Sequence, residues 1–324
     1  MINKIILLLF ILFLPLILFS QYKNNQQKRE KIRQPIKCPT GSYELVWQDE
    51  FEGNQLDTNY WRTTYGSPKP WDCTLPRGEC GTELQIYQAN NVQVNKGTLK
   101  LITRKESITY QGIYEAAHTC ANKNIGDTFS LDFKYTSGII VTKSDKIAFQ
   151  YGRYETRCKL PIGAGFWPAF WLWGGGGETG RAGEMDILEI FDTAQPIFTT
   201  SIHNGNRKAR QDIPLTWDIR DWHIYAVEYD PTEVRYFVDG QLIRTYKRFK
   251  NLACQDGQLI TKKRRYRRNA AFPWEQWMVL MLNLAINPEP SMTVNATTVF
   301  PATMEVDYVR VYKRNEEFSH QKRE

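Results

Sequence analysis

Residues 183–192 read Gly183-Glu184-Met185-Asp186-Ile187-Leu188-Glu189-Ile190-Phe191-Asp192, and they are the most informative segment of the chain. The apolar residues are those of a buried strand, yet three acids lie among them. Burying carboxylates costs free energy unless one face of the strand lines a water-filled cleft. Strand alternation puts Glu184 and Asp186 on one face and Met185 and Ile187 on the other. The segment therefore predicts a strand between a hydrophobic core and an open cleft.

Glu189 does not fit this alternation, because it lies five positions after Glu184 and would point into the core. One extra residue in a β-bulge at Ile187–Leu188 returns it to the cleft face, and such bulges are over-represented beside active sites. Glu184 and Glu189 can then lie roughly 5–5.5 Å apart, the separation that retaining glycosidases use. Asp186 between them is expected to hydrogen-bond Glu184 and to shape the protonation of the group. A calcium-binding or merely solvated acidic strand is the alternative.

Aromatic residues precede the acidic segment. Residues 163–173 read GAGFWPAFWLW, and the whole chain contains 10 Trp, 17 Tyr and 16 Phe. A period of two places Trp167, Trp171 and Trp173 on one strand face. Exposed aromatic rings are suited to the flat C–H faces of sugars, although packing in the core is the alternative for each ring.

Short segments with strand character follow one another along the rest of the chain, with turn signals between them. One example is the hairpin signal Asp239-Gly240. Nothing long carries a 3.6-residue apolar period. We therefore predict an all-β fold, a two-sheet β-sandwich of the jelly-roll kind with a concave substrate cleft. A single domain is expected over residues 41–314, followed by a polar tail at 315–324.

The N-terminal residues predict export. Lys4 precedes an unbroken apolar run, Ile5–Phe19, which indicates a secretory signal peptide over residues 1–20. An uncleaved membrane anchor is the alternative. Residues 21–40 are polar and basic and read as a linker. We expect a secreted or extracytoplasmic protein, in the periplasm or cell envelope, with envelope attachment as a variant of that location.

Six cysteines fit a compartment in which disulfides persist. Cys73 and Cys80 flank a short loop and are expected to form a local bridge. The other four are too scattered to pair from the sequence: Cys38, Cys120, Cys158 and Cys254.

The net charge of +7 is concentrated in basic runs, the densest of which is Lys262–Arg268. A solvated loop is the simplest interpretation. Contact with an anionic polysaccharide or envelope surface is the alternative, and nucleic acid binding is disfavoured for an exported chain.

The segment Glu184-x-Asp186-x-x-Glu189, preceded by Gly-Phe-Trp-Pro-Ala-Phe-Trp, resembles glycoside hydrolase family 16, the laminarinase, agarase and carrageenase group, in its β-bulge branch. The resemblance covers nearly the whole mature chain. Similar segments are Leu45–Phe51, Thr82–Tyr87, Tyr151–Glu155, Leu282–Ala285 and Met304–Tyr312.

The resemblance implies that Glu184 is the nucleophile, Glu189 the acid/base and Asp186 an assisting carboxylate. It places His203 in the cleft near the acid/base, with a structural role as the alternative. The implied substrate-binding residues are Trp167, Trp171, His203 and Asn283. No cofactor is implied for catalysis. A structural calcium on the convex face is implied, held by a closing-strand Asp and by main-chain oxygens near the opening strand. The corresponding candidates are Asp307, Glu50 and Gly97.

Two departures leave the substrate open. Thr82 stands where the family usually has Asn, and Asn287-Pro288 stands where laminarinases commonly show a Gly-rich run. We expect retaining endo-hydrolysis of a β-linked polysaccharide by a monomer, with β-1,3-glucan (laminarin) or mixed-linkage β-glucan as substrate. The alternatives are a marine galactan (agar, porphyran or carrageenan), transglycosylation, and a non-catalytic glycan-binding protein.

Overall fold

The structure is a computed structural model that describes residues 41–65, 83–113, 126–174, 183–195, 197–250, 253–255, 258–259, 269–271 and 276–315. Several expectations fall outside these residues. They concern the signal peptide at 1–20, the linker at 21–40, the Cys73–Cys80 bridge, Thr82, the basic run Lys262–Arg268 and the tail beyond Asn315.

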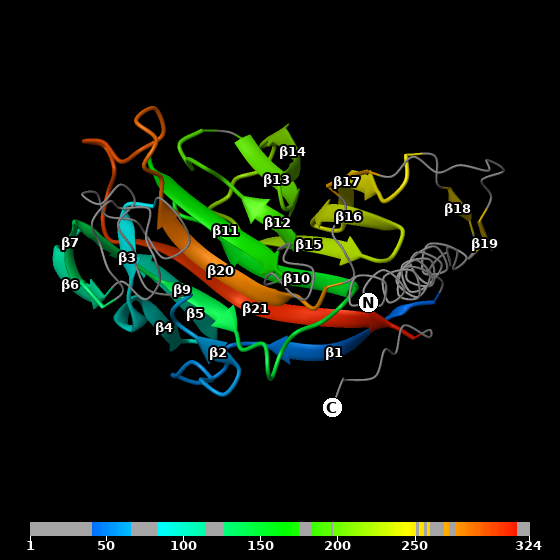
Figure 1. Ribbon diagram of the computed structural model, residues 1–324, viewed down its shortest axis with the longest axis horizontal. Coiled ribbons are helices and arrows are strands. Elements are labelled where there is room, and N and C mark those ends of the chain that lie inside the picture. Colours follow the sequence, from blue (N-terminus) through cyan, green and yellow to red (C-terminus); the bar gives the residue numbers. More distant parts are fainter. Residues whose placement is uncertain are drawn as a thin grey trace, which may run out of the picture.

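Two antiparallel sheets make up most of the described chain (Figure 1). The larger sheet contains, in spatial order, β17 (Gln241–Lys247), β16 (Glu233–Val238), β15 (His223–Tyr229), β10 (Gly152–Lys159), β21 (Ala302–Arg314), β5 (Thr98–Thr103) and β4 (Val92–Asn95), and β1 (Tyr43–Asp49) also pairs with β21. The smaller sheet contains β14 (Arg207–Pro214), β13 (Ile197–Asn204), β12 (Gly183–Glu189), β11 (Phe166–Trp173), β20 (Val279–Ile286), β9 (Ile139–Thr142) and β2 (Trp61–Arg62).

Short elements decorate the two sheets. These are the parallel pair β3 (Gln85–Tyr87) and β8 (Tyr135–Ser137), the hairpin β6 (Ile108–Ile113) and β7 (Thr128–Phe133), the pair β18 (Cys254–Gln255) and β19 (Gln258–Leu259), and one 3₁₀ turn, η1 (Ala89–Asn91). Within the described residues, no helix has the length and apolar character needed to cross a membrane.

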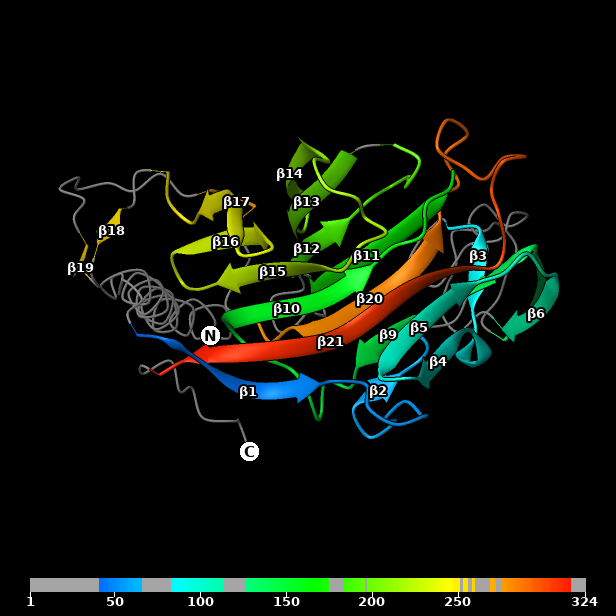
Figure 2. The same cartoon turned by 180° about the vertical axis from the view of Figure 1, so that it is seen from behind.

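The hydrophobic core lies between the two sheets, which are layered on one another in both views (Figures 1 and 2). The smaller sheet contributes alternate residues of its central strands, such as Phe170 and Leu282, and the larger sheet contributes Tyr154 and Val309. This alternation is what a strand with one buried face requires. The structure confirms the predicted all-β, two-sheet sandwich.

Cys158 lies in this core on β10 as a free thiol. Burial raises its pKa, which keeps the sulfur protonated and unreactive. It is therefore removed from the cysteines that the sequence left open for disulfide pairing.

The predicted β-bulge in β12 is present. On the β11 side, Phe170 faces Leu188 and Trp171 faces Asp186, so Ile187 is the extra residue. The register between β12 and β13 also shifts between Asp186 and Glu189. Ile187 and Leu188 are consecutive and both belong to the core. Glu189 is therefore returned to the face opposite the core.

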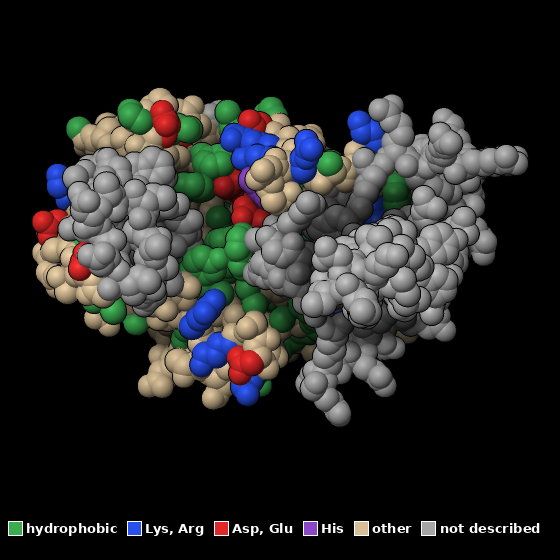
Figure 3. Space-filling view, viewed as in Figure 1, with side chains coloured by type: hydrophobic (Ala, Val, Ile, Leu, Met, Phe, Trp, Pro, Cys, Tyr) green, Lys and Arg blue, Asp and Glu red, His purple; other side chains and the backbone are tan. Residues whose placement is uncertain are grey.

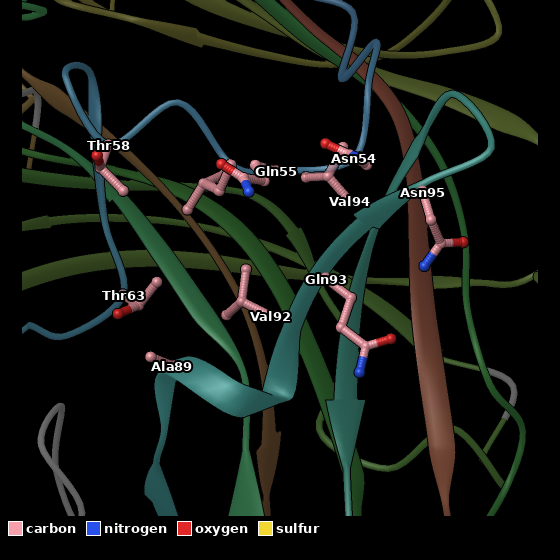
Figure 4. A pocket seen from close by; sticks show the side chains of 10 residues that line it. Asn54, Gln55, Thr58, Thr63, Ala89, Val92, Gln93, Val94 and Asn95 are labelled. Atoms are coloured by element: carbon pink, nitrogen blue, oxygen red, sulfur yellow. The ribbon is translucent and has the colours of Figure 1, made fainter.

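A hollow between the β1–β2 connection and β4 lies at the sheet edge away from β14 (Figure 4). Its lining is uncharged and consists of Asn54, Gln55, Leu56, Thr58, Thr63, Ala89, Val92, Gln93, Val94 and Asn95. Because it contains no carboxyl, imidazole or amine, it offers no group suited to acid–base chemistry.

The bulge can be tested by truncating both inward residues. Ile187→Ala and Leu188→Ala should each lower the free energy of unfolding by about 2–5 kcal/mol, because each leaves a cavity in the core. Leu45→Ala, at a position 46% exposed, is the control and should change it by less than about 0.5 kcal/mol. Chemical denaturation measures all three. Simple alternation would leave one of the two β12 positions tolerant, and that result would contradict the bulge.

Candidate active site

Three carboxyl side chains share the outer face of β12. Glu184 lies opposite Trp173 on β11 and Glu189 lies opposite Ala169, with Asp186 between them opposite Trp171. Figure 3 shows acidic side chains and a histidine in a hollow between hydrophobic side chains, with lysine and arginine side chains beside them. The bulge thus brings together the three acids that the sequence singled out.

An apolar floor adjoins the carboxyls. It is made of side chains from β3, β9 and β20 that pack together, with Trp171 and Trp173 against them: Tyr87, Ile139, Val141, Val279 and Met281. Tyr65 contacts both tryptophans, with ring centroids 6.3 and 6.2 Å apart. These five residues are themselves buried. The part that a sugar ring can reach is formed by the partly exposed rings of Tyr65, Trp171 and Trp173, which are suited to the C–H faces of sugars.

Hydrogen bonds hold Trp171 and Asn283 in this floor. The indole Nε1–H of Trp171 donates to Asn283 Oδ1 at 2.8 Å. Asn283 Nδ2 in turn donates to the hydroxyl of Tyr87 at 3.1 Å. Both predicted substrate-binding residues therefore lie on the cleft face. Asn283 orients a tryptophan ring as well as presenting its own amide.

Trp167 contacts Glu189 directly. Its indole Nε1–H donates to Glu189 Oε1 at 3.3 Å, and its ring packs on Phe191 with centroids 5.0 Å apart. Arg210 from β14 lies over the other ring of this pair, 4.6 Å from the Phe191 centroid. Arg210, Phe191 and Trp167 are thus stacked in a row at the Glu189 end of the three carboxyls.

His203 lies at the opposite end of the carboxyls. Its Nε2 is 3.5 Å from Glu184 Oε1 and 3.3 Å from Asp186 Oδ2. The β12–β13 register explains this position, because it pairs His203 with Glu184 and Thr199 with Glu189. The expectation that His203 lies near the acid/base stays a prediction.

The protonation of the three groups is strongly shifted. Burial, reinforced by Asp186, raises the pKa of Glu184 to about 7. Burial also raises the pKa of Glu189 well above its usual range, with Asp186 and Glu184 adding to the effect. A hydrogen bond to Asp186 raises the pKa of His203. The expected hydrogen bond between Asp186 and Glu184 stays a prediction. At neutral pH the site can therefore hold a protonated Glu189 beside a readily ionised Glu184.

Glu184, Asp186 and His203 are also the one group among the described residues whose ligand atoms lie close enough together to hold a metal ion, within 4.8 Å of one another. Two of these three, Glu184 and Asp186, are acids to which the family resemblance gives a role in glycoside hydrolysis. Hydrolysis by a pair of carboxyl groups requires no metal ion.

The predicted calcium ligands have other partners. Both carboxylate oxygens of Glu50 accept hydrogen bonds from Arg310, at 2.7 and 2.9 Å. Asp307 Oδ2 accepts one from Arg157 at 2.6 Å. Gly97 lies in a turn with φ of +70°. Because the Arg157 guanidinium already engages the Asp307 carboxylate, this side chain does not fit the role of a cation ligand as it stands. At Glu50 and Gly97 the expected ligands are main-chain oxygens, and that expectation stays a prediction.

The sequence profile described as "Glycosyl hydrolases family 16" matches residues 82–262, which is more than half of the 324-residue chain. The chain belongs to glycosyl hydrolases family 16. "Glucan endo-1,3-beta-glucosidase A1" of Niallia circulans is 30% identical over 313 residues, which make up 89% of this chain and 40% of that relative. The "Beta-glucanase" of Rhodothermus marinus is 30% identical over 287 residues, or 84% of this chain and 85% of that relative.

A solved structure gives the same result. The catalytic domain of an endo-1,3-beta-glucanase (laminarinase) from Thermotoga petrophila superposes with a TM-score of 0.64 and 27% identity, covering 86% of this chain and 100% of that domain. Family 16 membership, expected from the carboxyl strand and its flanking motifs, and the jelly-roll fold, expected from the succession of short strands, are thereby confirmed. Glucanases of family 16 need no cofactor for catalysis.

Sequence reasoning missed several residues of the family 16 cleft. Tyr65, Tyr87 and Phe191 support the tryptophans, and Lys208 and Arg210 contribute cations. The two cations reach the cleft because of the register of β13 with β14, which pairs His203 with Lys208. The sequence does not reveal this register, because Arg207–Pro214 is too polar to show which of its faces is buried.

Glu184→Gln should stabilise the protein at alkaline pH. The folded-state pKa of Glu184 is about 7, above that of the unfolded chain, so the native state loses stability as pH rises through that window. The glutamine variant avoids this loss. Its free energy of unfolding should exceed that of the wild-type protein by about 1–3 kcal/mol at pH 8, with little difference at pH 4.5. Denaturant unfolding at both values provides the measurement. An equal gain at both would mean that ionisation of Glu184 is not the cause.

Proposed function

We propose that this chain is a retaining endo-hydrolase of β-1,3-glucan of the laminarin type, with mixed-linkage β-glucan as a further substrate. The observation that carries the proposal is the bulged strand, which presents Glu184 and Glu189 on one face with different environments. Glu189 is the more deeply buried and holds its proton, whereas Glu184 is bridged by His203 and ionises more readily. The names of the Niallia and Rhodothermus relatives support the substrate class.

The first half-reaction uses the two glutamates together. The Glu189 carboxyl gives its proton to the glycosidic oxygen as the bond from that oxygen to the anomeric carbon breaks. The Glu184 carboxylate attacks the same carbon from the opposite side and forms a glycosyl ester with inversion. The Trp167 N–H on Glu189 Oε1 stabilises the carboxylate that this proton transfer leaves behind.

The second half-reaction returns both groups to their starting state. Glu189, now ionised, takes a proton from water, and the oxygen of that water attacks the anomeric carbon. The ester bond to Glu184 breaks with a second inversion, so the product keeps the original configuration. Asp186 and His203 contact Glu184. They are suited to holding this carboxylate in line and to stabilising its charge when it leaves.

A protein confined to sugar binding would not require this arrangement. Carboxyls with raised pKa values cost folding free energy, and such groups cluster at functional sites. The aromatic floor alone would be sufficient for binding. We therefore favour catalysis over the alternative of a non-catalytic glycan-binding protein.

The cellular setting follows from the sequence. We propose that residues 1–20 direct export and that the mature chain acts outside the cytoplasm as a monomer, with attachment to the envelope as an alternative. The Lys4 and Ile5–Phe19 pattern supports the signal peptide, and the cysteine content of six supports a compartment that permits disulfides.

Glu184→Gln should abolish turnover of laminarin, with kcat reduced on the order of 10⁴-fold or more, because the amide cannot form the glycosyl ester that the proposed mechanism requires. The fold should remain intact by circular dichroism, and laminarin oligosaccharides should still bind by isothermal calorimetry. Substantial residual turnover by a homogeneous sample would rule out Glu184 as the nucleophile.

Azide rescue separates the two glutamates. Glu189→Ala should lose about 10²–10⁴-fold in kcat on laminarin, yet azide should restore turnover of an activated aryl β-glucoside and give a β-glycosyl azide, because it attacks the glycosyl ester. In Glu184→Ala, azide attacks the substrate directly and should give the α-glycosyl azide. Nuclear magnetic resonance of the products identifies the anomer. The reverse pair of anomers would exchange the two roles.

A further inference from the structure

Strand β14 forms one edge of the smaller sheet and borders the carboxyls across β13. Lys208 pairs with His203, Arg210 with Ser201 and Asp212 with Thr199. Paired residues on antiparallel strands lie on the same face. The side chains of Lys208, Arg210 and Asp212 therefore share the cleft face with His203. The alternate residues of β14, Ala209 and Ile213, pack against the core.

Arg210 is fixed at the Glu189 end of the cleft. Its Nε donates to Asp212 Oδ1 at 2.7 Å, and its guanidinium lies 4.6 Å from the centroid of Phe191. Phe191 packs on Trp167, which hydrogen-bonds Glu189. Because Asp212 is engaged through Nε, the two terminal nitrogens of Arg210 remain available for a planar anion.

Lys208 is the less constrained cation. Its side chain is exposed, and within the part of the chain that the structure describes no carboxylate lies within ion-pair distance of its ammonium. It is nevertheless close to the catalytic group, because its positive charge lowers the pKa of Glu184, of Glu189 and of His203. A solvated ammonium beside a substrate cleft is suited to binding an anion as a point charge.

We propose that Lys208 and Arg210 form a subsite for an anionic substituent, a sulfate ester or a carboxylate, on a sugar bound next to the scissile bond. This inference rests on the proposed function and extends its substrate class to β-glycans that carry an anionic substituent. Three carboxyls in the cleft would repel such a substituent at close range. Cations on β14 offset that repulsion along the one edge at which they lie.

A simpler role for the same cations is charge compensation. If Lys208 only balances the catalytic carboxyls, its removal changes the pH profile and lowers turnover of neutral and acidic glycans by the same factor. If it binds a substituent, its removal selectively lowers kcat/KM for the acidic glycan. The ratio between substrates that share one backbone therefore distinguishes the two roles.

The test uses laminarin, partially sulfated laminarin and carboxymethylated laminarin, which differ only in substituent. Lys208→Met should lower kcat/KM on one or both anionic substrates about tenfold or more beyond any loss that it causes on laminarin. This difference should shrink in 0.5 M NaCl because salt screens exposed charges. The arm that responds identifies the substituent as sulfate or carboxylate.

Two controls accompany the measurement. Lys159→Met removes a lysine from β10 of the other sheet, where its partner is Glu305, and should leave the substrate ratio unchanged. Glu184→Gln and Glu184→Gln/Lys208→Met are compared for binding of sulfated laminarin oligosaccharides by calorimetry, and the double variant should bind more weakly.

Three outcomes overturn one or both ideas. Equal loss on neutral and anionic laminarin would leave Lys208 as a charge-compensating residue and refute the subsite. Activity of the wild-type protein on neutral laminarin alone, with the anionic forms rejected, would also refute it while leaving the proposed function intact. Hydrolysis of none of the three, but of the galactan pair agarose and porphyran, would refute the proposed glucan backbone. In that case the Lys208→Met ratio on porphyran against agarose would test the subsite.

Discussion

The single extra residue in β12 is the constraint on which the rest of the site depends. With Ile187 bulged, two consecutive side chains point into the core and Glu189 rejoins Glu184 and Asp186 on the outer face. Without the bulge, a carboxyl group would enter a core made of Phe, Leu and Ile side chains, at a cost of several kcal/mol. The same bulge therefore keeps the core between the sheets apolar and places the two glutamates together on the outer face.

The crowded carboxyls are costly to the native state, and their surroundings show how that cost is limited. Burial raises the pKa values of Glu184 and Glu189. Protonation then removes charge that the fold could not otherwise accommodate. The Trp167 N–H, the His203 ring and the charge of Lys208 act in the opposite direction and favour ionisation. The balance leaves one carboxyl ready to donate a proton and another ready to ionise, which is what double displacement requires.

Local patterns made the fold and the acid strand predictable, whereas register did not. Alternation of apolar residues with acids needs no knowledge of neighbours, so Glu184, Asp186, Glu189 and the bulge could be placed from the sequence. Lys208 and Arg210 could not, because Arg207–Pro214 is a polar segment whose cleft face appears only once it pairs with β13. The Asp307 carboxylate, which was expected to bind calcium, accepts a hydrogen bond from Arg157, 150 positions away in sequence. No local pattern reports such partners.

The two sides of the cleft are chemically unlike, and this asymmetry bears on how a glycan lies in it. Toward β20 and β9 the surface is aromatic, because the partly exposed Trp171 and Trp173 pack on buried residues of those strands and Trp171 is held by Asn283. Toward β14 it is polar and cationic. A sugar ring that packs its C–H face on the apolar side presents its substituents to the other side, where water and cations can solvate them. The aromatic side thus meets the ring faces that neutral and acidic glycans share, and the cationic side meets the substituents in which they differ.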